Sequence, residues 1–228
     1  MRNRSRGQRF PASPRPLARI FARIFALTTA LGALTLLPTG ASAAKQVKSR
    51  VPRARSKKKS KKRPPRPVMG YRKAKVTIVF WGDFQCPFTH RLYKTLKKLL
   101  AKYPKKVKVV WADFPLGVHK QAKPAAIAGR SVFEQKGSKA FWKYLEALFS
   151  KTTRFSQQDI LDAVSAAGAS SSKASRAISR GTHSRRLKKS IAKGKSKGVR
   201  GTPCMFINGK KLNGAQRLPR ILQVVNSI

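Results

Sequence analysis

Hydrophobic and polar positions in the second part of the chain change from one period to another, and this change predicts a strand, a helix and a second strand. Residues 76–81 form a continuous β-branched and aromatic run, the pattern of a strand buried on both faces. From residue 92 to residue 103 the apolar positions recur at helical spacing between lysines, and Pro104 ends the helix. Residues 107–114 form the next strand pattern. We therefore predict a strand, helix, strand unit with a parallel crossover.

Beyond this unit the pattern is helical for a long stretch and then returns to strands. Residues 121–197 show helical spacing throughout. Residues 203–214 are typical of a hairpin, because the turn dipeptide Asn208-Gly209 separates two short strand patterns. A short helix follows at residues 218–225. This order predicts one α/β domain over residues 76–228, with an inserted all-helical subdomain at about 121–197.

The N-terminal segment combines a basic start with a short apolar run. Seven arginines precede the apolar residues 24–37, and Ala41-Ser42-Ala43 supplies the small residues of a cleavage site. This run is shorter than the ~20 residues that a spanning helix needs. We therefore predict a signal peptide over residues 1–43, with an uncleaved membrane anchor as the alternative. Export would place the protein in the periplasm or outside the cell, in an oxidising compartment of the bacterial envelope.

The charge of the chain is far from balanced, because 53 Lys and Arg residues against 6 Asp and Glu residues give a net charge of +47. Residues 44–75 are rich in lysine, arginine and proline and contain no acid. Like charges repel and prolines prevent regular pairing, so we predict a disordered polybasic arm. Such an arm favours nonspecific binding to anionic envelope polymers or a lipid surface. There is little interleaving of aromatic residues among its charges, so specific nucleic-acid binding is not indicated.

The chain has two cysteines, Cys86 and Cys204, which excludes a scaffold of several disulfides. Cys86 lies where the first predicted strand gives way to the predicted helix, and the N–H groups and dipole of a helix N-terminus stabilise a thiolate. Cys86 is therefore a candidate nucleophile, and a half-buried inert thiol is the alternative. His90, in the first helical turn, is expected to be a solvated surface side chain. No paired Cys or His spacing indicates a metal site, and no motif indicates a cofactor.

Several separated segments between residues 75 and 226 resemble, in order, the DsbA-like family of thiol-disulfide oxidoreductases in the thioredoxin superfamily. The segments are Asp83-Phe84-Gln85-Cys86-Pro87-Phe88, Gly201-Thr202-Pro203, Phe206-Ile207-Asn208-Gly209 and Gly214-Ala215-Gln216. The resemblance implies a thioredoxin-like fold with an inserted all-helical subdomain. It also implies an oxidoreductase that acts on protein or peptide thiols.

The resemblance also assigns roles to individual residues. In the family, a first cysteine attacks a substrate disulfide, a cis-proline aligns the bound peptide, and a second cysteine resolves the mixed disulfide. Cys86 matches the first cysteine and Pro203 the cis-proline, with Thr202 presenting its backbone to the peptide. The active-site motif of this chain is Cys86, Pro87, Phe88 and Thr89. Because Thr89 stands at the position of the resolving cysteine, we expect a monothiol site whose mixed disulfide is released by another thiol.

Cys204 is the candidate second thiol, since the resemblance places the residue after the cis-proline on the strand beside the active-site helix. Three outcomes remain open: a disulfide between Cys86 and Cys204, a buried and inert Cys204 thiol, or bonding of Cys204 to another molecule. Phe80 also departs from the family, because related proteins often carry a buried acid at this strand position.

Three functions are compatible with these features. The first is an exported thiol-disulfide oxidoreductase that works through Cys86. The second is a catalytically degenerate thioredoxin-fold module that binds peptides and is tethered to anionic envelope surfaces by its basic arm. The third makes the arm at residues 44–75 primary, with the folded domain as its cargo. We adopt the first as the working hypothesis.

Overall fold

The computed structural model describes residues 66–151 and 153–228. Its backbone contacts separate residues 59–228 from the residues before them, and every described residue belongs to this second unit. The predicted signal peptide at 1–43 and the first part of the predicted arm, at 44–65, therefore lie outside the described residues.

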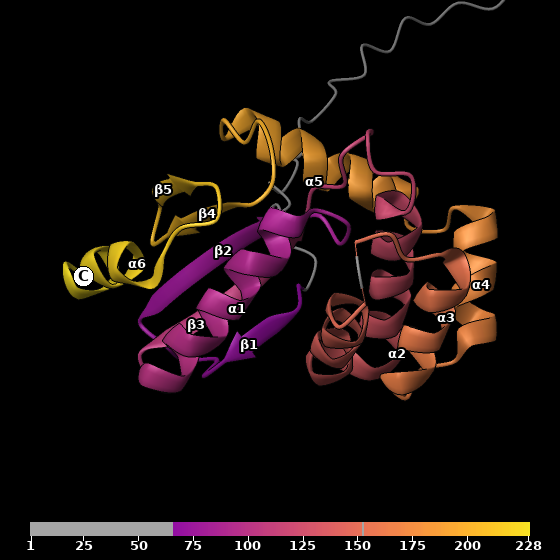
Figure 1. Ribbon diagram of the computed structural model, residues 1–228, viewed down its shortest axis with the longest axis horizontal. Helices are drawn as coiled ribbons and strands as arrows, with labels where there is room; N and C mark the ends of the chain where they lie inside the picture. Colours follow the sequence, from indigo (N-terminus) through magenta and orange to yellow (C-terminus); the bar gives the residue numbers. More distant parts are fainter. Residues whose placement is uncertain (1–65, 152) are drawn as a thin grey trace, which may run out of the picture. The chain divides into compact units, whose positions relative to one another are not determined.

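The described part of the chain contains one five-stranded mixed sheet (Figure 1). Its strands are β1 (Val68–Gly70), β2 (Val76–Gly82), β3 (Val107–Asp113), β4 (Cys204–Ile207) and β5 (Lys210–Asn213). They follow the spatial order β1-β3-β2-β4-β5. β2 and β3 are parallel, whereas β1 pairs antiparallel with β3 and the β4–β5 hairpin pairs antiparallel with β2. The predicted parallel unit and the predicted hairpin are both present.

The two faces of the sheet are covered by different helices. The helices are α1 (Pro87–Lys102), α2 (Ala122–Phe149), α3 (Gln157–Ala166), α4 (Ser171–Arg180), α5 (Ser184–Ser196) and α6 (Leu218–Asn226). α1 and α6 bury apolar side chains in the same cluster as Ile78 and Phe80 of β2. α5 packs on the other face, where Gly194 lies against Trp81 and Phe114. The continuous apolar run of β2 is explained by this burial on both sides.

The helical insertion occupies the predicted region, since α2 to α5 all fall between residues 121 and 197. α2, α3 and α4 form a helical layer beside the sheet (Figure 1). α2 is broken at Gly137, whose φ of 76° lies outside the helical region. α3 begins with a capping box in which Ser156 and Asp159 satisfy each other's backbone N–H groups. The insertion is thus built from helices with well-defined boundaries.

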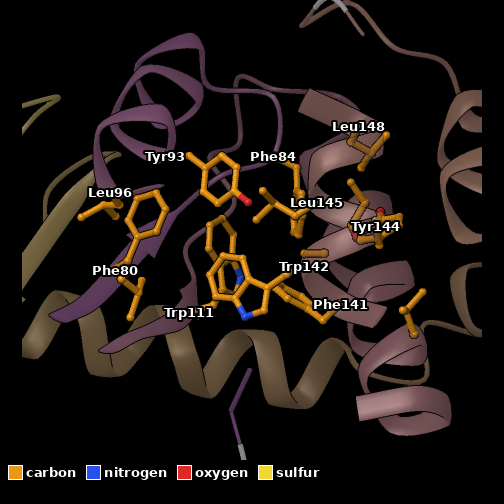
Figure 2. Packing of buried hydrophobic residues seen from close by; sticks show 14 of the residues in the cluster. Phe80, Phe84, Tyr93, Leu96, Trp111, Phe141, Trp142, Tyr144, Leu145 and Leu148 are labelled. Atoms are coloured by element: carbon orange, nitrogen blue, oxygen red, sulfur yellow. Dashed lines mark hydrogen bonds between the residues drawn. The ribbon is translucent and has the colours of Figure 1, made fainter. Parts of the chain in front are cut away.

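An aromatic cluster joins the sheet to α2. Phe84, two residues after the end of β2, lies 5.0 Å from Trp111 of β3 and 5.5 Å from Tyr144 of α2, measured between ring centroids. Trp111 also lies 5.9 Å from Phe141 of α2. Figure 2 shows these rings between the strands and the helix. Because Phe84 is two residues before Cys86, the cluster that fixes the insertion also fixes the turn carrying the candidate nucleophile.

The predicted boundary of the arm at residue 75 is wrong. Val68–Gly70 forms strand β1, and the Trp111 N–H donates to the carbonyl oxygen of Pro67 at 3.0 Å. β1 is short, and its neighbours are the same basic and proline residues that fill the arm, which is why the composition concealed it. The folded domain therefore begins before residue 76.

Candidate active site

Cys86 lies at the junction of β2 and α1, as predicted. Cys86 is the N-cap residue of α1 and has an extended backbone, and Pro87 begins the helix with the fixed φ that suits a first helical position. The N–H groups of Thr89 and His90 donate to the Cys86 carbonyl, so this first turn is fully formed. No acidic residue lies in that turn, so the positive end of the helix dipole is not offset by one.

The sulfur of Cys86 faces the loop before β4. Cys86 Sγ donates a hydrogen bond to the carbonyl oxygen of Thr202 at 3.2 Å, across 116 residues of chain. The Thr202–Pro203 peptide bond is cis, in line with the role that the resemblance gave to Pro203. The structure therefore brings together three of the predicted site residues, Cys86, Thr202 and Pro203. Cys86 is only 3% exposed, whereas Phe88 of the same motif is 51% exposed.

A buried carboxylate holds the turn before Cys86. Asp83 Oδ1 accepts from the N–H of Gln85 at 2.7 Å, and Asp83 Oδ2 accepts from the N–H of Leu116 at 2.8 Å. His119 Nδ1 lies 2.8 Å from the same Oδ2 atom. Asp83 thus ties the active-site turn to the loop after β3. This role of Asp83 was not predicted from the sequence. A signal was available, because an aspartate whose side chain can accept from the backbone N–H two residues later often forms an Asx-turn.

Gln85 connects the same turn to the helical insertion. Its Nε2 atom donates to the carbonyl of Thr153 at 3.0 Å, and its Oε1 atom accepts from the N–H of Gln121, the N-cap of α2, at 2.6 Å. The side chain of the residue before Cys86 therefore contacts both the start of α2 and the loop that follows α2. Nothing in the sequence indicated these contacts, which join segments 36 and 68 residues apart.

Thr89 is fully buried behind the nucleophile. Its Oγ1 atom accepts from the N–H of Asp83 at 3.5 Å, and its methyl group lies beside Gly82 and Trp111. The described contacts of its hydroxyl thus lie with the backbone of the turn and not with the Cys86 sulfur. Thr89 occupies the site of the missing second sulfur as a packed structural residue.

Cys204 lies on the other face of the sheet from α1. Cys204 is directly opposite Trp81 in the antiparallel ladder, and opposite residues project to the same face. It packs with Trp81 and Phe114 under α5, and its Sγ donates to Asn213 Oδ1 at 3.4 Å. Burial raises the pKa of the Cys204 thiol. Both cysteines are free thiols in this structure.

His90 is not the solvated surface side chain that the sequence suggested. Its ring stacks on Phe149 of α2 with centroids 3.7 Å apart, and its Nε2 atom bonds to the carbonyl of Phe84 at 2.8 Å. Burial is the main cause that lowers the pKa of His90 below 6.5, and Lys94 acts in the same direction. His90 therefore serves as a contact between α1 and the insertion.

A buried ion pair closes the end of β3. Asp113 accepts from Arg130 Nε of α2 and from Trp111 Nε1, each at 2.6 Å, and all three side chains are buried. This pair was not predicted from the sequence, because 17 residues separate the two charges and neither segment carries a motif that indicates a contact with the other. Phe80, where related proteins often carry an acid, lies instead in the core against Trp111. Within the described residues no group of three His, Cys, Asp or Glu side chains could hold a metal ion.

Comparison with known sequences identifies two kinds of relatives. The family described as thioredoxin matches residues 62–227. The chain is also 27% identical over 161 residues to the Na(+)/H(+) antiporter NhaA 3 of Salinispora tropica, an alignment covering 70% of this chain and 24% of the antiporter. The chain thus spans about a quarter of that relative's length. Among the described residues, no helix is both long enough and apolar enough to cross a bilayer.

Comparison with solved structures identifies the form of the fold. Oxidised BdbD from Bacillus subtilis superposes with a TM-score of 0.64 and 20% identity, covering 71% of this chain and 91% of BdbD. The thiol-disulfide exchange protein alpha-DsbA2 from Wolbachia pipientis superposes with a TM-score of 0.61 and 22% identity, covering 71% of this chain and 86% of that one. The predicted fold is therefore confirmed. With its thioredoxin match over residues 62–227, its mixed sheet and its helical insertion, the chain belongs to the thioredoxin family and has the DsbA-like form of that fold.

Proposed function

We propose that this protein carries out thiol-disulfide exchange on protein or peptide substrates, with Cys86 as the nucleophile. The observation that carries the proposal is the position of the Cys86 sulfur, at the N-terminus of α1 and 3.2 Å from the carbonyl oxygen of Thr202. The N-terminus of a helix is a position that favours negative charge, as develops on the attacking sulfur in disulfide exchange. The Cys86 sulfur also lies beside the backbone of the cis-proline loop, where an extended peptide can pair.

The exchange is balanced without a cofactor. The Cys86 thiolate attacks one sulfur of a substrate disulfide, a new S–S bond forms to Cys86, and the other substrate sulfur leaves as a thiolate. The exposed ring of Phe88, two residues after Cys86, provides apolar surface for a substrate. Approach of the substrate has to displace the contact between Cys86 Sγ and Thr202, since the sulfur is nearly covered in the free protein.

We further propose a monothiol cycle. The chain has no third cysteine, Thr89 fills the position of a resolving sulfur, and Cys204 packs on the other face of the sheet. The mixed disulfide at Cys86 is therefore released by a thiol from another molecule. Cys204 acts as a buried structural thiol.

The cellular setting is part of the proposal. A basic N-terminus, an apolar run and an A-x-A site support export through a signal peptide at residues 1–43, to the periplasm or the cell exterior. The basic residues that follow support association of the mature protein with anionic envelope polymers or lipids. Disulfide exchange on exported proteins suits such an oxidising compartment.

The reaction with an aromatic disulfide reagent tests the role of Cys86. We expect the native protein to release the aromatic thiol rapidly at neutral pH. Cys204→Ala should behave alike, because Cys204 lies under α5, away from the N-terminus of α1, and the pKa of its thiol is raised. Cys86→Ala should abolish the rapid phase. A slow reaction of the native protein, or a rapid phase that survives in Cys86→Ala, would refute the proposal.

The burial of Cys86 favours one alternative function, a peptide-binding module without turnover. In that case the cis-proline loop would bind an extended peptide while the covered sulfur stayed unreactive. Peptide binding that is equal in the native protein and Cys86→Ser, together with no catalysed exchange, would support this alternative over the oxidoreductase.

A further inference from the structure

A pocket lies beside the cis-proline loop, between the end of α5 and the β4–β5 hairpin. Its volume is about 370 Å³. Its walls include Arg200, Thr202, Pro203, Lys211 and Asn213, together with three glycines. Small-molecule sites typically have volumes of roughly 300–1,000 Å³, so the pocket suits a ligand at the small end of that range.

Thr202 connects this pocket to the reactive sulfur. It forms part of the pocket wall, and its carbonyl oxygen accepts the hydrogen bond from Cys86 Sγ at 3.2 Å. A small molecule bound against Thr202 would therefore contact a residue that is itself hydrogen-bonded to the sulfur of Cys86.

The pocket carries positive charge and, among the described residues that line it, no negative charge. Arg200 is exposed at its rim. Lys211 is exposed too, and its Nζ atom donates to the carbonyl of Gly198, so the ammonium group is held at the pocket wall that Gly198 helps to form. Two cations in a small pocket without an acid favour an anionic ligand.

We propose that this pocket binds the carboxylate of a small anionic thiol, which resolves the mixed disulfide at Cys86. The inference rests on the proposed exchange at Cys86, which creates the need for an external thiol. The thiolate of the small molecule attacks the substrate sulfur of the mixed disulfide. One S–S bond breaks and one forms, Cys86 leaves as a thiolate, and the substrate departs joined to the small thiol, so no other oxidant or reductant takes part.

Release of a trapped mixed disulfide by thiols of different charge tests this proposal. The full chain is first converted at Cys86 to a methyl disulfide, in which a neutral methylthio group caps the sulfur as Cys86–S–S–CH3. Release of this cap is then followed by mass spectrometry with 3-mercaptopropionate, 2-mercaptoethanol or cysteamine. Each rate is divided by the rate of the same thiol on a small neutral disulfide, which removes differences in intrinsic reactivity. We expect the normalised rate to be highest for the anion, to saturate with its concentration, and to be lowest for the cation.

Two matched variants separate the pocket from the general positive field of the chain. Arg200→Gln should lower the normalised rate for the anion roughly fivefold and leave the neutral thiol unchanged, as expected for loss of one partly exposed ion pair. Arg176→Gln removes the same charge from α4, away from the pocket lining, and should change neither rate. Equal normalised rates for the three thiols, or an equal effect of the two variants, would overturn the pocket assignment while leaving exchange at Cys86 intact. Failure of Cys86 to accept the cap would overturn both.

Discussion

The candidate nucleophile Cys86 is positioned by neighbouring side chains that make hydrogen bonds of their own. The buried Asp83 holds the turn from one side through three polar contacts, and the half-buried Gln85 holds it from the other by bridging to the start of α2 and to the loop after it. Thr89 fills the space behind the sulfur. These contacts hold Cys86 in place although Thr89 stands where a second cysteine would lie.

The ion pair between Asp113 and Arg130 gives the first prediction for single residues. Asp113→Asn leaves the Arg130 guanidinium buried without a charge partner, and breaking a buried pair typically costs about 3–5 kcal/mol. We expect a loss of that size in the free energy of unfolding, measured by urea denaturation. Glu134→Gln, which breaks the exposed contact with Arg186, is the control and should cost about 1 kcal/mol or less. Equal losses in the two variants would contradict the account.

His90 gives a prediction for the pH dependence of stability. Because burial lowers the pKa of His90 in the folded protein, the unfolded chain binds more protons as the pH falls below 6.5. The free energy of unfolding is therefore unaffected by His90 protonation above pH 6.5. It decreases as the pH falls from 6.5 towards the lower pKa that His90 has in the folded protein. We expect the loss between about pH 7.5 and about pH 5.5 to be smaller in His90→Gln than in the native protein. An NMR titration that places the His90 pKa above 6.5 would show this burial effect to be absent.

At the scale of elements, the junction of β2 and α1 depends on a glycine. A Cβ atom added at Gly82 would lie 2.6 Å from Cζ3 of Trp111 and 3.0 Å from the methyl carbon of Thr89, both of them rigid and buried. This close approach brings Thr89, and with it the first turn of α1, against the end of the sheet. The junction thus requires a residue without a side chain.

Gly82→Ala is therefore expected to lower the free energy of unfolding by about 1–3 kcal/mol, the usual cost of overpacking a core. It should also slow the reaction of Cys86 with a disulfide reagent, because the first turn of α1 has to move. Gly117→Ala, where an added Cβ meets nothing within 4 Å, is the matched control. Urea denaturation of both variants checks the stability, and a neutral effect of Gly82→Ala would mean that the junction is looser than described.

Much of the element pattern could be predicted because it depends on local signals. The hairpin turn is an example, since Asn208 and Gly209 adopt the positive φ values of 44° and 96° that this dipeptide favours. The side of the sheet on which the Cys204 side chain lies was not predictable from local signals. Residues 204–207 are all apolar, so no alternation in the sequence shows which side chains face α1 and which face α5. Pairing of Cys204 with Trp81 decides it, and such register is a property of the assembled sheet.

The contacts of the insertion were unpredictable for a related reason. His90 with Phe149 and Arg130 with Asp113 are pairs between separate elements. The polar members of these pairs, His90, Arg130 and Asp113, each have an ordinary surface interpretation when taken alone. The boundary of the arm was predicted wrongly because the prediction relied on composition, whereas Val68–Gly70 is a strand only through its pairing with β3. The cysteine and the cis-proline were found because both lie in compact motifs.

At the scale of the whole molecule, we expect the basic N-terminal segment and the folded domain to be separable in function. The folded domain contains all six acidic residues of the chain, whereas residues 44–65 contain none. Deleting residues 44–65 should weaken binding to anionic lipid vesicles by on the order of tenfold or more, because clustered basic residues each add about 1 kcal/mol near such a surface. The binding that remains should depend less steeply on salt concentration. Vesicle sedimentation measures the binding. The rate at Cys86 should stay unchanged in the same variant, and unaltered vesicle binding would contradict a role of this segment.

The most direct test of the account is the fate of the two sulfurs after the native protein reacts with a peptide disulfide in the absence of any other thiol. Intact mass and peptide mapping identify the product. The account predicts a stable mixed disulfide between Cys86 and the peptide, with Cys204 still a free thiol, and release only after an external thiol is added. Spontaneous release of the peptide with formation of a Cys86–Cys204 disulfide would contradict it.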